Sequence, residues 1–132
     1  MGFKRACVYD GRLEREARTG DGWLANVRVT TNASAGNQSI TIPQILGGVA
    51  LFTGAAGAVN LTTPTAADII AAMPDMDIGD TYVFKLTETA AQTATIVAGT
   101  GVTLAGFTTL NAATRTCIIE KTAATTVTIT TI

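Results

Sequence analysis

Histidine is absent from this chain of 132 residues, and both charged and aromatic side chains are scarce. Histidine is the commonest general base in enzymes and a very frequent metal ligand, so its absence argues against most hydrolases and metalloenzymes. Only 14% of the residues are charged and 5% are aromatic. These absences weaken the case for a catalytic residue or a bound metal ion, and we assign neither from the composition.

Cysteine is also scarce, with only Cys7 and Cys117. Two cysteines are too few for a disulfide framework in a chain of this length, so we expect free thiols, with Cys117 in the core. The N-terminus lacks the regions of a signal peptide, and no apolar run reaches the roughly 18 residues that predict a membrane span. We therefore expect a protein that is made in the cytoplasm and binds no membrane.

Threonine, alanine and glycine dominate instead, with 25, 22 and 13 residues. The hydrophobic share of 47% consequently depends on Ala, Val, Ile and Leu. Thr, Val and Ile favour β-strands, and a chain of this length is typical of one domain. Because small side chains provide little core volume, we expect the chain to bury sheet surfaces against copies of itself.

The formal net charge of −1 predicts no nucleic-acid partner, but the charge is unevenly distributed. Residues 1–28 hold six basic and four acidic side chains, whereas residues 29–132 hold three basic and six acidic ones. Two interpretations of residues 1–26 stay open: a solvated tail, or an extended arm that docks on an acidic or mixed surface. Aromatic and arginine side chains are the usual anchors of interfaces. The candidate contact residues of such an arm are Phe3, Arg5, Tyr9, Arg12, Arg15, Arg18 and Trp23.

Residues 27–132 are predicted to form a single β-rich body, because short apolar or Thr-rich runs alternate there with turns rich in Gly, Asn and Pro. One helix is expected at about 65–73, since Thr65 is a good N-cap, Asp68 completes an approximate capping box and Pro74 stops the helix. The expected strands span residues 27–31, 39–42, 49–53, 58–61, 81–87, 93–98, 102–105, 114–121 and 125–132.

The strand at 81–87 has the clearest pattern, because Tyr82, Phe84 and Leu86 alternate with other residues and are expected to point inward. Residues 99–101 are predicted to be a hairpin loop, within an antiparallel sheet that extends from residue 81 onward. We therefore predict a mainly β fold: an antiparallel β-sandwich, jelly-roll or barrel-like body with one short helix and an extended N-terminal arm. Candidate residues for packing between subunits are Ile69, Ile70, Met73, Val127 and Ile129.

Asp75, Asp77 and Asp80 form the densest acidic cluster. Carboxylates at alternate positions occur in calcium loops, but the glycine and glutamate of an EF-hand are missing, so a solvated turn is favoured over a cation site. Asp75 and Asp80 are also the only candidates for catalysis. Because the sequence has no nucleophile paired with a base, an enzyme is the least favoured class of function.

Four segments carry a resemblance to capsid decoration (cement) and head-fibre proteins of tailed bacteriophages. They are TAADIIAAMP at 65–74, IGDTYVFKL at 78–86, ATIVAGTGVTLAG at 94–106 and TTVTI at 125–129. Where such sequences often carry Asn after the aromatic strand, this chain has Glu88-Thr89-Ala90. The resemblance implies a small β-rich protein that assembles as a homotrimer on the outside of a phage head, with no enzymatic activity and no cofactor.

The expected function is that of a non-enzymatic virion structural protein, made in the host cytoplasm. It would bind the major capsid protein on the outer capsid surface and stabilise the shell as a trimeric decoration protein. The alternative is a phage fibre or receptor-binding module that recognises a ligand on the host surface. A decoration protein is present in many copies over the head, whereas a fibre-tip protein is present in few copies at a tail or vertex.

Overall fold

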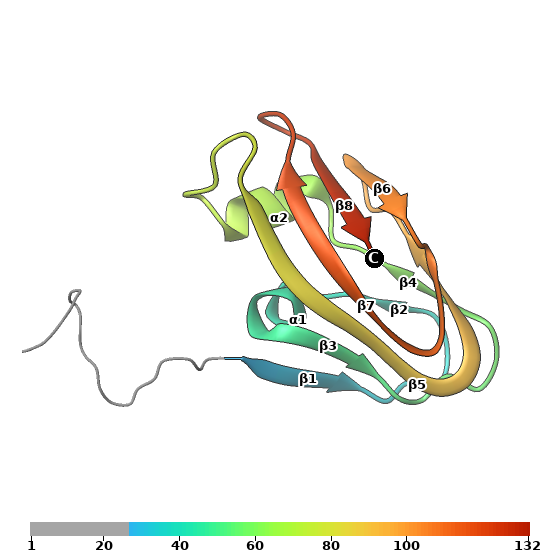
Figure 1. The fold of residues 1–132 in the computed structure, drawn as a ribbon. Helices are drawn as coiled ribbons and strands as arrows, with labels where there is room; N and C mark the ends of the chain where they lie inside the picture. The colour runs from blue at the N-terminus through green and yellow to red at the C-terminus, as the bar shows by residue number, and fades with distance from the viewer. Residues whose placement is uncertain (1–26) are drawn as a thin grey trace, which may run out of the picture.

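The computed structural model describes residues 27–132, which form eight strands and two short helices (Figure 1). In chain order these are β1 (Arg28–Asn32), β2 (Gln38–Ser39), α1 (Ile42–Gly47), β3 (Gly48–Phe52), β4 (Val59–Thr62), α2 (Ala66–Ala72), β5 (Thr81–Val97), β6 (Val102–Gly106), β7 (Thr109–Lys121) and β8 (Val127–Thr131). The predicted mainly β body is therefore confirmed. The predicted arm, residues 1–26, lies outside the described residues.

β5 organises the sheet because it is long enough to pair with different strands along its length. It has 17 residues, and its register shifts between Glu88 and Thr93. Its first half pairs with β3 and its second half with β4, both in parallel, while β7 pairs with both halves in the antiparallel sense. Such irregularities bend a strand, and Figure 1 shows β5 and β7 curving together.

The sheet is mixed, which corrects the expectation of an antiparallel body. β1 pairs with β3, β2 with β4 and β6 with β8 in parallel. Antiparallel pairing among the described strands is confined to β5 with β7 and β7 with β8. Parallel neighbours need a crossover connection, and α1 lies between β1 and β3 in the chain while α2 lies between β4 and β5. Alternation along one strand says which residues face inward, but not in which direction the neighbouring strand runs.

α1 begins where the sequence pattern predicts the end of a strand over residues 39–42. The Thr41 hydroxyl accepts a hydrogen bond from the Gln44 backbone N–H at 3.3 Å, and the Gln44 side-chain oxygen accepts one from the Thr41 backbone N–H at 2.9 Å. This is a complete capping box, and Pro43 suits the first turn of a helix. Gly48 ends the helix with a φ of 101°, which favours glycine. The cap therefore outweighs the β-propensity of the isoleucines beside it.

α2 confirms the helix predicted at about 65–73. It spans Ala66–Ala72, and the Thr65 hydroxyl accepts a hydrogen bond from the Asp68 backbone N–H at 3.1 Å. Ala66 and Ile69 are buried, so the helix packs one side against the core.

The hairpin predicted at residues 99–101 is wrong. β7 and β8 lie between β5 and β6 in the sheet, and β6 pairs with β8. The turn packs instead against the start of α2, where the Ala66 N–H donates to the Thr100 carbonyl at 2.8 Å. Gly99 permits this approach, because a Cβ there would lie 2.5 Å from the Pro64 carbonyl oxygen. A glycine-bearing turn predicts a change of chain direction, but it does not specify which strand the next segment joins.

The core lies between the inner face of the curved sheet and the two helices. Phe84 and Leu86 are buried and Tyr82 is half-buried against the core, in agreement with the predicted alternation. Cys117 is a buried free thiol, as expected, and burial raises its pKa to about 12. Most other core side chains are small aliphatic ones. They are Ile40, Ile45, Ala50, Val59, Leu61, Ala66, Ile69, Ala94, Ile96, Leu110, Ile119, Val127 and Ile129, joined by Phe52.

Three of the residues expected to pack between subunits belong to this core. Ile69, Val127 and Ile129 expose 0%, 1% and 1% of their surface, because the single chain already covers them. The expectation is corrected for these three. Ile70 and Met73 are half-buried against the core. The alternation in β8 points Val127 and Ile129 to the inner face.

Candidate interaction surfaces

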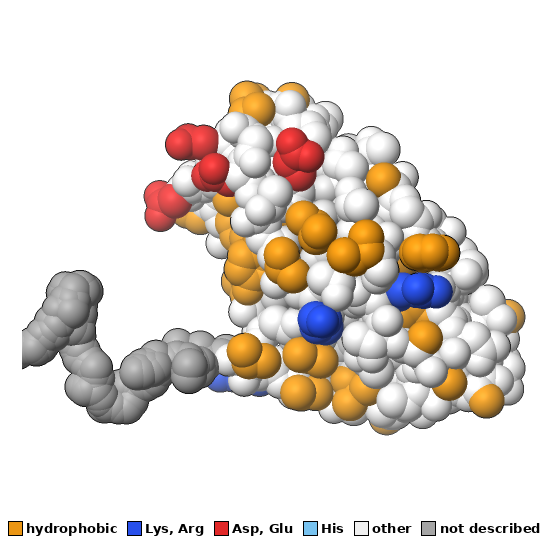
Figure 2. Space-filling model, viewed as in Figure 1, with side chains coloured by type: hydrophobic (Ala, Val, Ile, Leu, Met, Phe, Trp, Pro, Cys, Tyr) orange, Lys and Arg blue, Asp and Glu red, His pale blue; other side chains and the backbone are white. Residues whose placement is uncertain are grey.

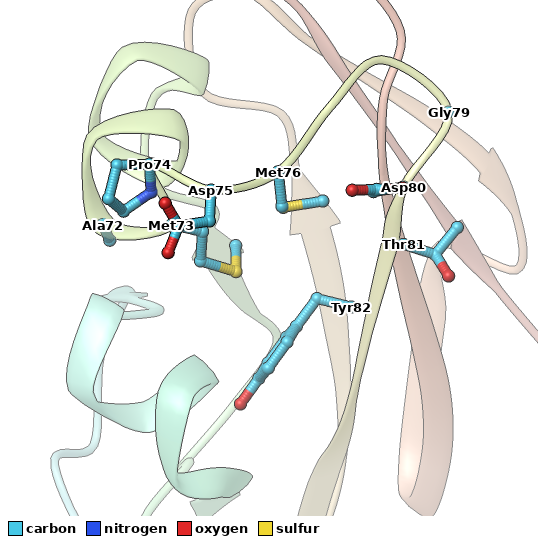
Figure 3. Close-up of a pocket in the computed structure, with 9 residues that line it drawn as sticks. All are labelled: Ala72, Met73, Pro74, Asp75, Met76, Gly79, Asp80, Thr81 and Tyr82. Atoms are coloured by element: carbon cyan, nitrogen blue, oxygen red, sulfur yellow. The ribbon is translucent and has the colours of Figure 1, made fainter.

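The loop between α2 and β5 borders an open hollow of about 670 Å³ (Figure 3). In Figure 3 the Met73 and Tyr82 side chains extend into the space between α2 and α1. Thioether and aromatic groups adapt well to apolar partners, so this part of the hollow suits an apolar side chain. The lining residues are Ala72, Met73, Pro74, Asp75, Met76, Gly79, Asp80, Thr81 and Tyr82.

Three exposed carboxylates, of Asp75, Asp77 and Asp80, lie on this loop. Hydrogen bonds hold the backbone of the loop in place. The Asp77 N–H donates to Asp80 Oδ2 at 2.9 Å, and the Asp80 N–H donates to the Asp77 carbonyl at 3.0 Å. Lys121 Nζ donates to the Met76 carbonyl at 3.0 Å and joins the loop to the end of β7. In Figure 3 Met76 lies between Asp75 and Asp80, so these carboxylates do not converge. The loop has the geometry of a solvated acidic turn.

A second hollow, of about 680 Å³, lies at the start of β1. Val27, Val29 and Leu46, three of its lining residues, expose 76%, 56% and 42% of their surface. One hydrogen bond links the linings of the two hollows: Tyr82 lines the first, and its hydroxyl donates at 2.9 Å to the carbonyl of Leu46, which lines the second. We call the two together the side groove. Its end beside β1 carries the apolar side chains of Val27, Val29, Pro43 and Leu46 together with Arg28 and Gly47, and we call it the apolar end for those four residues. Its acidic end is the α2–β5 loop.

The outer face of the sheet also carries apolar side chains, and α1 and α2 leave it open because both bury their side chains in the core on the inner face. Strand register places Val29 opposite Val49 and Val83 opposite Ile118 on this outer face. Val29, Val83 and Ile132 expose 56%, 51% and 61% of their surface. The outer-face band consists of Val29, Val49, Leu51, Val83, Ile118 and Ile132. Figure 2 shows hydrophobic side chains distributed across the face that β5 and β7 present.

Glu88 is the only charged side chain buried among residues 27–132. It exposes 1% of its surface, and neither carboxylate oxygen has a hydrogen-bond partner. Burial raises the pKa of Glu88 above its ordinary value, while the Ala90 backbone N–H, which lies nearby without forming a well-aligned hydrogen bond, opposes this by a smaller amount. Sequence reasoning missed this residue, although Glu88 continues the inward alternation of Phe84 and Leu86 and its burial follows from that pattern.

Phe107 provides an exposed aromatic platform just before β7. The Arg115 guanidinium carbon lies 4.4 Å from the centre of the Phe107 ring, a cation–π contact. Phe107 exposes 57% of its surface. Its backbone is tied to β8, because its N–H donates to the Thr131 carbonyl at 3.2 Å and the Thr131 hydroxyl donates to the Phe107 carbonyl. The ring is therefore presented from a backbone that β8 holds in place.

The candidate arm contacts fall outside residues 27–132. They are Phe3, Arg5, Tyr9, Arg12, Arg15, Arg18 and Trp23. Within the described residues, acidic and cysteine side chains form no group of three that suits a metal ion. None of the helices in this part of the chain is long and apolar enough to cross a membrane.

In comparisons with known proteins, no protein-family model, curated protein or solved structure matches this chain.

Proposed function

We propose that this protein is a non-enzymatic structural component of a tailed-phage virion. In this proposal it binds the major capsid protein on the outer capsid surface and stabilises the shell as a homotrimeric decoration protein. The observation that carries the proposal is the outer-face band, an apolar sheet surface with several strongly exposed members. Contiguous exposed apolar surface is typical of sites of protein association. The resemblance of residues 64–132 to decoration proteins supplies the phage context.

The residues around the outer-face band also suit an interface between proteins. Two charged residues share this face with the band: Lys85, opposite Val49 and Thr116, and Glu120, opposite Thr81. Thr114 and Thr87 bond to each other there through their hydroxyls at 2.9 Å, so part of the polar surface is already satisfied. Interface cores are depleted in charge, and a stable interface needs roughly 800 Å² from each partner. A sheet face that spans β1, β3, β5, β7 and β8 offers a surface of suitable composition.

Stabilisation of the shell then follows from mass action. A trimer that binds the assembled lattice, and does not bind the separated capsid subunits, lowers the free energy of the lattice. The size of this stabilisation grows with the concentration of the trimer relative to the dissociation constant of the trimer for the lattice. Three equal contacts on one trimer add avidity without any new type of contact. Neither effect requires catalysis or a cofactor.

Val83→Asp tests the role of the outer-face band, because Val83 is exposed and a carboxylate there opposes burial against another protein. Light scattering of the purified unmodified chain should give the mass of a trimer, and Val83→Asp should shift the protein toward monomer or abolish co-sedimentation with capsids of the parent phage. Asn60→Asp adds the same charge at an exposed position of β4 and should change neither result. A monodisperse monomer that also leaves capsids unbound would contradict the proposal.

Phe107 favours a second candidate function, a fibre or receptor-binding module. An exposed aromatic ring with a cation stacked on it is a suitable platform for a host surface ligand such as a carbohydrate. Immunogold labelling of virions with an antibody to this chain separates the candidates. Dense label over the head supports decoration, whereas sparse label at the tail or at one vertex supports receptor binding. If the protein binds a receptor, Phe107→Ala is the variant expected to lose adsorption to host cells.

A further inference from the structure

The side groove begins where residues 1–26 join the described fold, and its composition complements theirs. Val27, the first described residue, lines its apolar end. We propose that the side groove is the docking site for this chain's own residues 1–26. Aromatic side chains of that segment occupy the apolar end, and its basic side chains lie beside the acidic loop. The proposal concerns the isolated chain and is independent of the phage assignment.

The apolar end of the groove has the exposure of an unfilled binding surface. Val27, Val29 and Leu46 lie around one hollow and expose 76%, 56% and 42% of their surface. Burying such side chains contributes about 25 cal/mol per Å² of apolar area. Residues 1–26 contain the apolar and aromatic groups to cover them, including Trp23, the only tryptophan of the chain. Trp23 precedes Val27 by only four residues, which span at most about 14 Å when extended.

The continuation of the groove provides a path from the apolar end to the acidic loop. The Tyr82 hydroxyl donates to the Leu46 carbonyl at 2.9 Å, so Tyr82 links the lining of the acidic end to that of the apolar end. Met73 and Met76 line the next part. Aromatic and methionine side chains make interfaces that adapt to varied partners. A segment that starts at Val27 therefore meets apolar surface first and carboxylates farther along.

Charge distribution favours the same occupant. Residues 1–26 hold five basic and four acidic side chains, whereas residues 27–132 hold four basic and six acidic ones. Three of those six acids, Asp75, Asp77 and Asp80, are exposed on the loop at the far end of the groove, and Figure 2 shows acidic side chains gathered at that end of the molecule. Attraction between exposed charges acts over about 10 Å at moderate salt. Because the segment is tethered at Val27, its local concentration near the groove is high.

Trp23 fluorescence provides a direct test, because the chain has no other tryptophan. The proposal predicts that acrylamide quenches Trp23 in the full chain at least about twofold less than in a peptide of residues 1–26. Leu46→Asp should raise quenching toward the peptide value. Asp75→Asn with Asp80→Asn should raise quenching too and remove its salt dependence. Asp68→Asn, an exposed acid of α2 outside the groove, is the matched control and should leave quenching unchanged.

Two results overturn the proposal. The first is quenching in the full chain equal to that in the peptide. The second is protection of Trp23 that increases with protein concentration, because the segment would then dock on a second copy. Circular dichroism and thermal unfolding of each variant establish that the body remains folded, which is expected because Leu46, Asp75 and Asp80 are partly or fully exposed. The assay contains no capsid, so its failure leaves the proposed function standing.

Discussion

Glu88→Gln should stabilise the protein at alkaline pH, because it removes a buried charge that has no partner. The carboxylate exposes 1% of its surface, and neither oxygen accepts a hydrogen bond. Glutamine has nearly the same shape but carries no charge, so the substitution changes electrostatics with little change in packing. Phe52 and Ala113 are the residues paired with Glu88 on β3 and β7, and neither side chain can donate a hydrogen bond to it.

The size of the effect follows from the cost of an unsatisfied buried group. That cost is about 1–3 kcal/mol for a neutral group and larger for a charged one. Since the substituted glutamine side chain retains a buried polar amide, only the charge-dependent part is recovered, and we expect about 1–2 kcal/mol. For a domain of this size that corresponds to a rise in Tm of about 4–9 °C. Glu88→Met, which also removes the polar atoms, should be at least as stable.

The pH dependence has a defined sign. Folding favours the protonated form of a carboxyl group whose pKa is raised in the folded state, as it is for Glu88. The stability that this protonated group contributes is fully present below the unfolded pKa and is lost as the pH rises through the folded pKa. Urea unfolding of both proteins from pH 4 to pH 9 measures this. The unmodified protein should lose stability relative to Glu88→Gln as pH increases, and the two should converge near pH 4.

Glu120→Gln is the matched control, because Glu120 is an exposed glutamate at the end of β7. It should change the unfolding free energy by less than about 0.5 kcal/mol at every pH. The reasoning is refuted if Glu88→Gln is no more stable than the unmodified protein at pH 9, or if the difference between them does not vary with pH.

Three further predictions test the core, a helix cap and the buried thiol. Phe84→Ala removes the largest fully buried side chain and should lower the unfolding free energy by about 3–5 kcal/mol in urea; a loss below about 1 kcal/mol would contradict the assigned core. Thr41→Ala should cost about 1 kcal/mol by the same assay, because it removes the hydroxyl that caps α1, whereas Thr41→Ser should be nearly neutral. Cys117, with its pKa raised to about 12, should resist a thiol reagent at pH 8 in the native protein and react only in denaturant, as mass spectrometry would show; rapid native labelling of Cys117 would contradict its burial.

Features that depend on neighbouring residues along the chain were predictable from the sequence. The α2 helix follows from Thr65, Asp68 and Pro74, and the inward face of β5 follows from its period of two. The α1 capping box at Thr41 and Gln44 carries a signal of the same local kind. The inward position of Glu88 follows from the same period as Phe84. Hydrogen bonds of a cap and the alternation of a strand involve residues close in sequence, so the residue pattern reports them.

Features that depend on distant residues came only from the tertiary structure. β8 pairs with β7 on one edge and with β6, in parallel, on the other, and the residues of β6 and β8 alone do not predict this arrangement. Ile69, Val127 and Ile129 are buried in one core with residues of β3, β5 and β7 that lie far from them in the sequence. The side groove is lined by segments distant in the sequence, and Tyr82 and Leu46, 36 residues apart, meet there through one hydrogen bond. Chain composition predicted a protein with surfaces to bury, and long-range packing decided which surfaces those are.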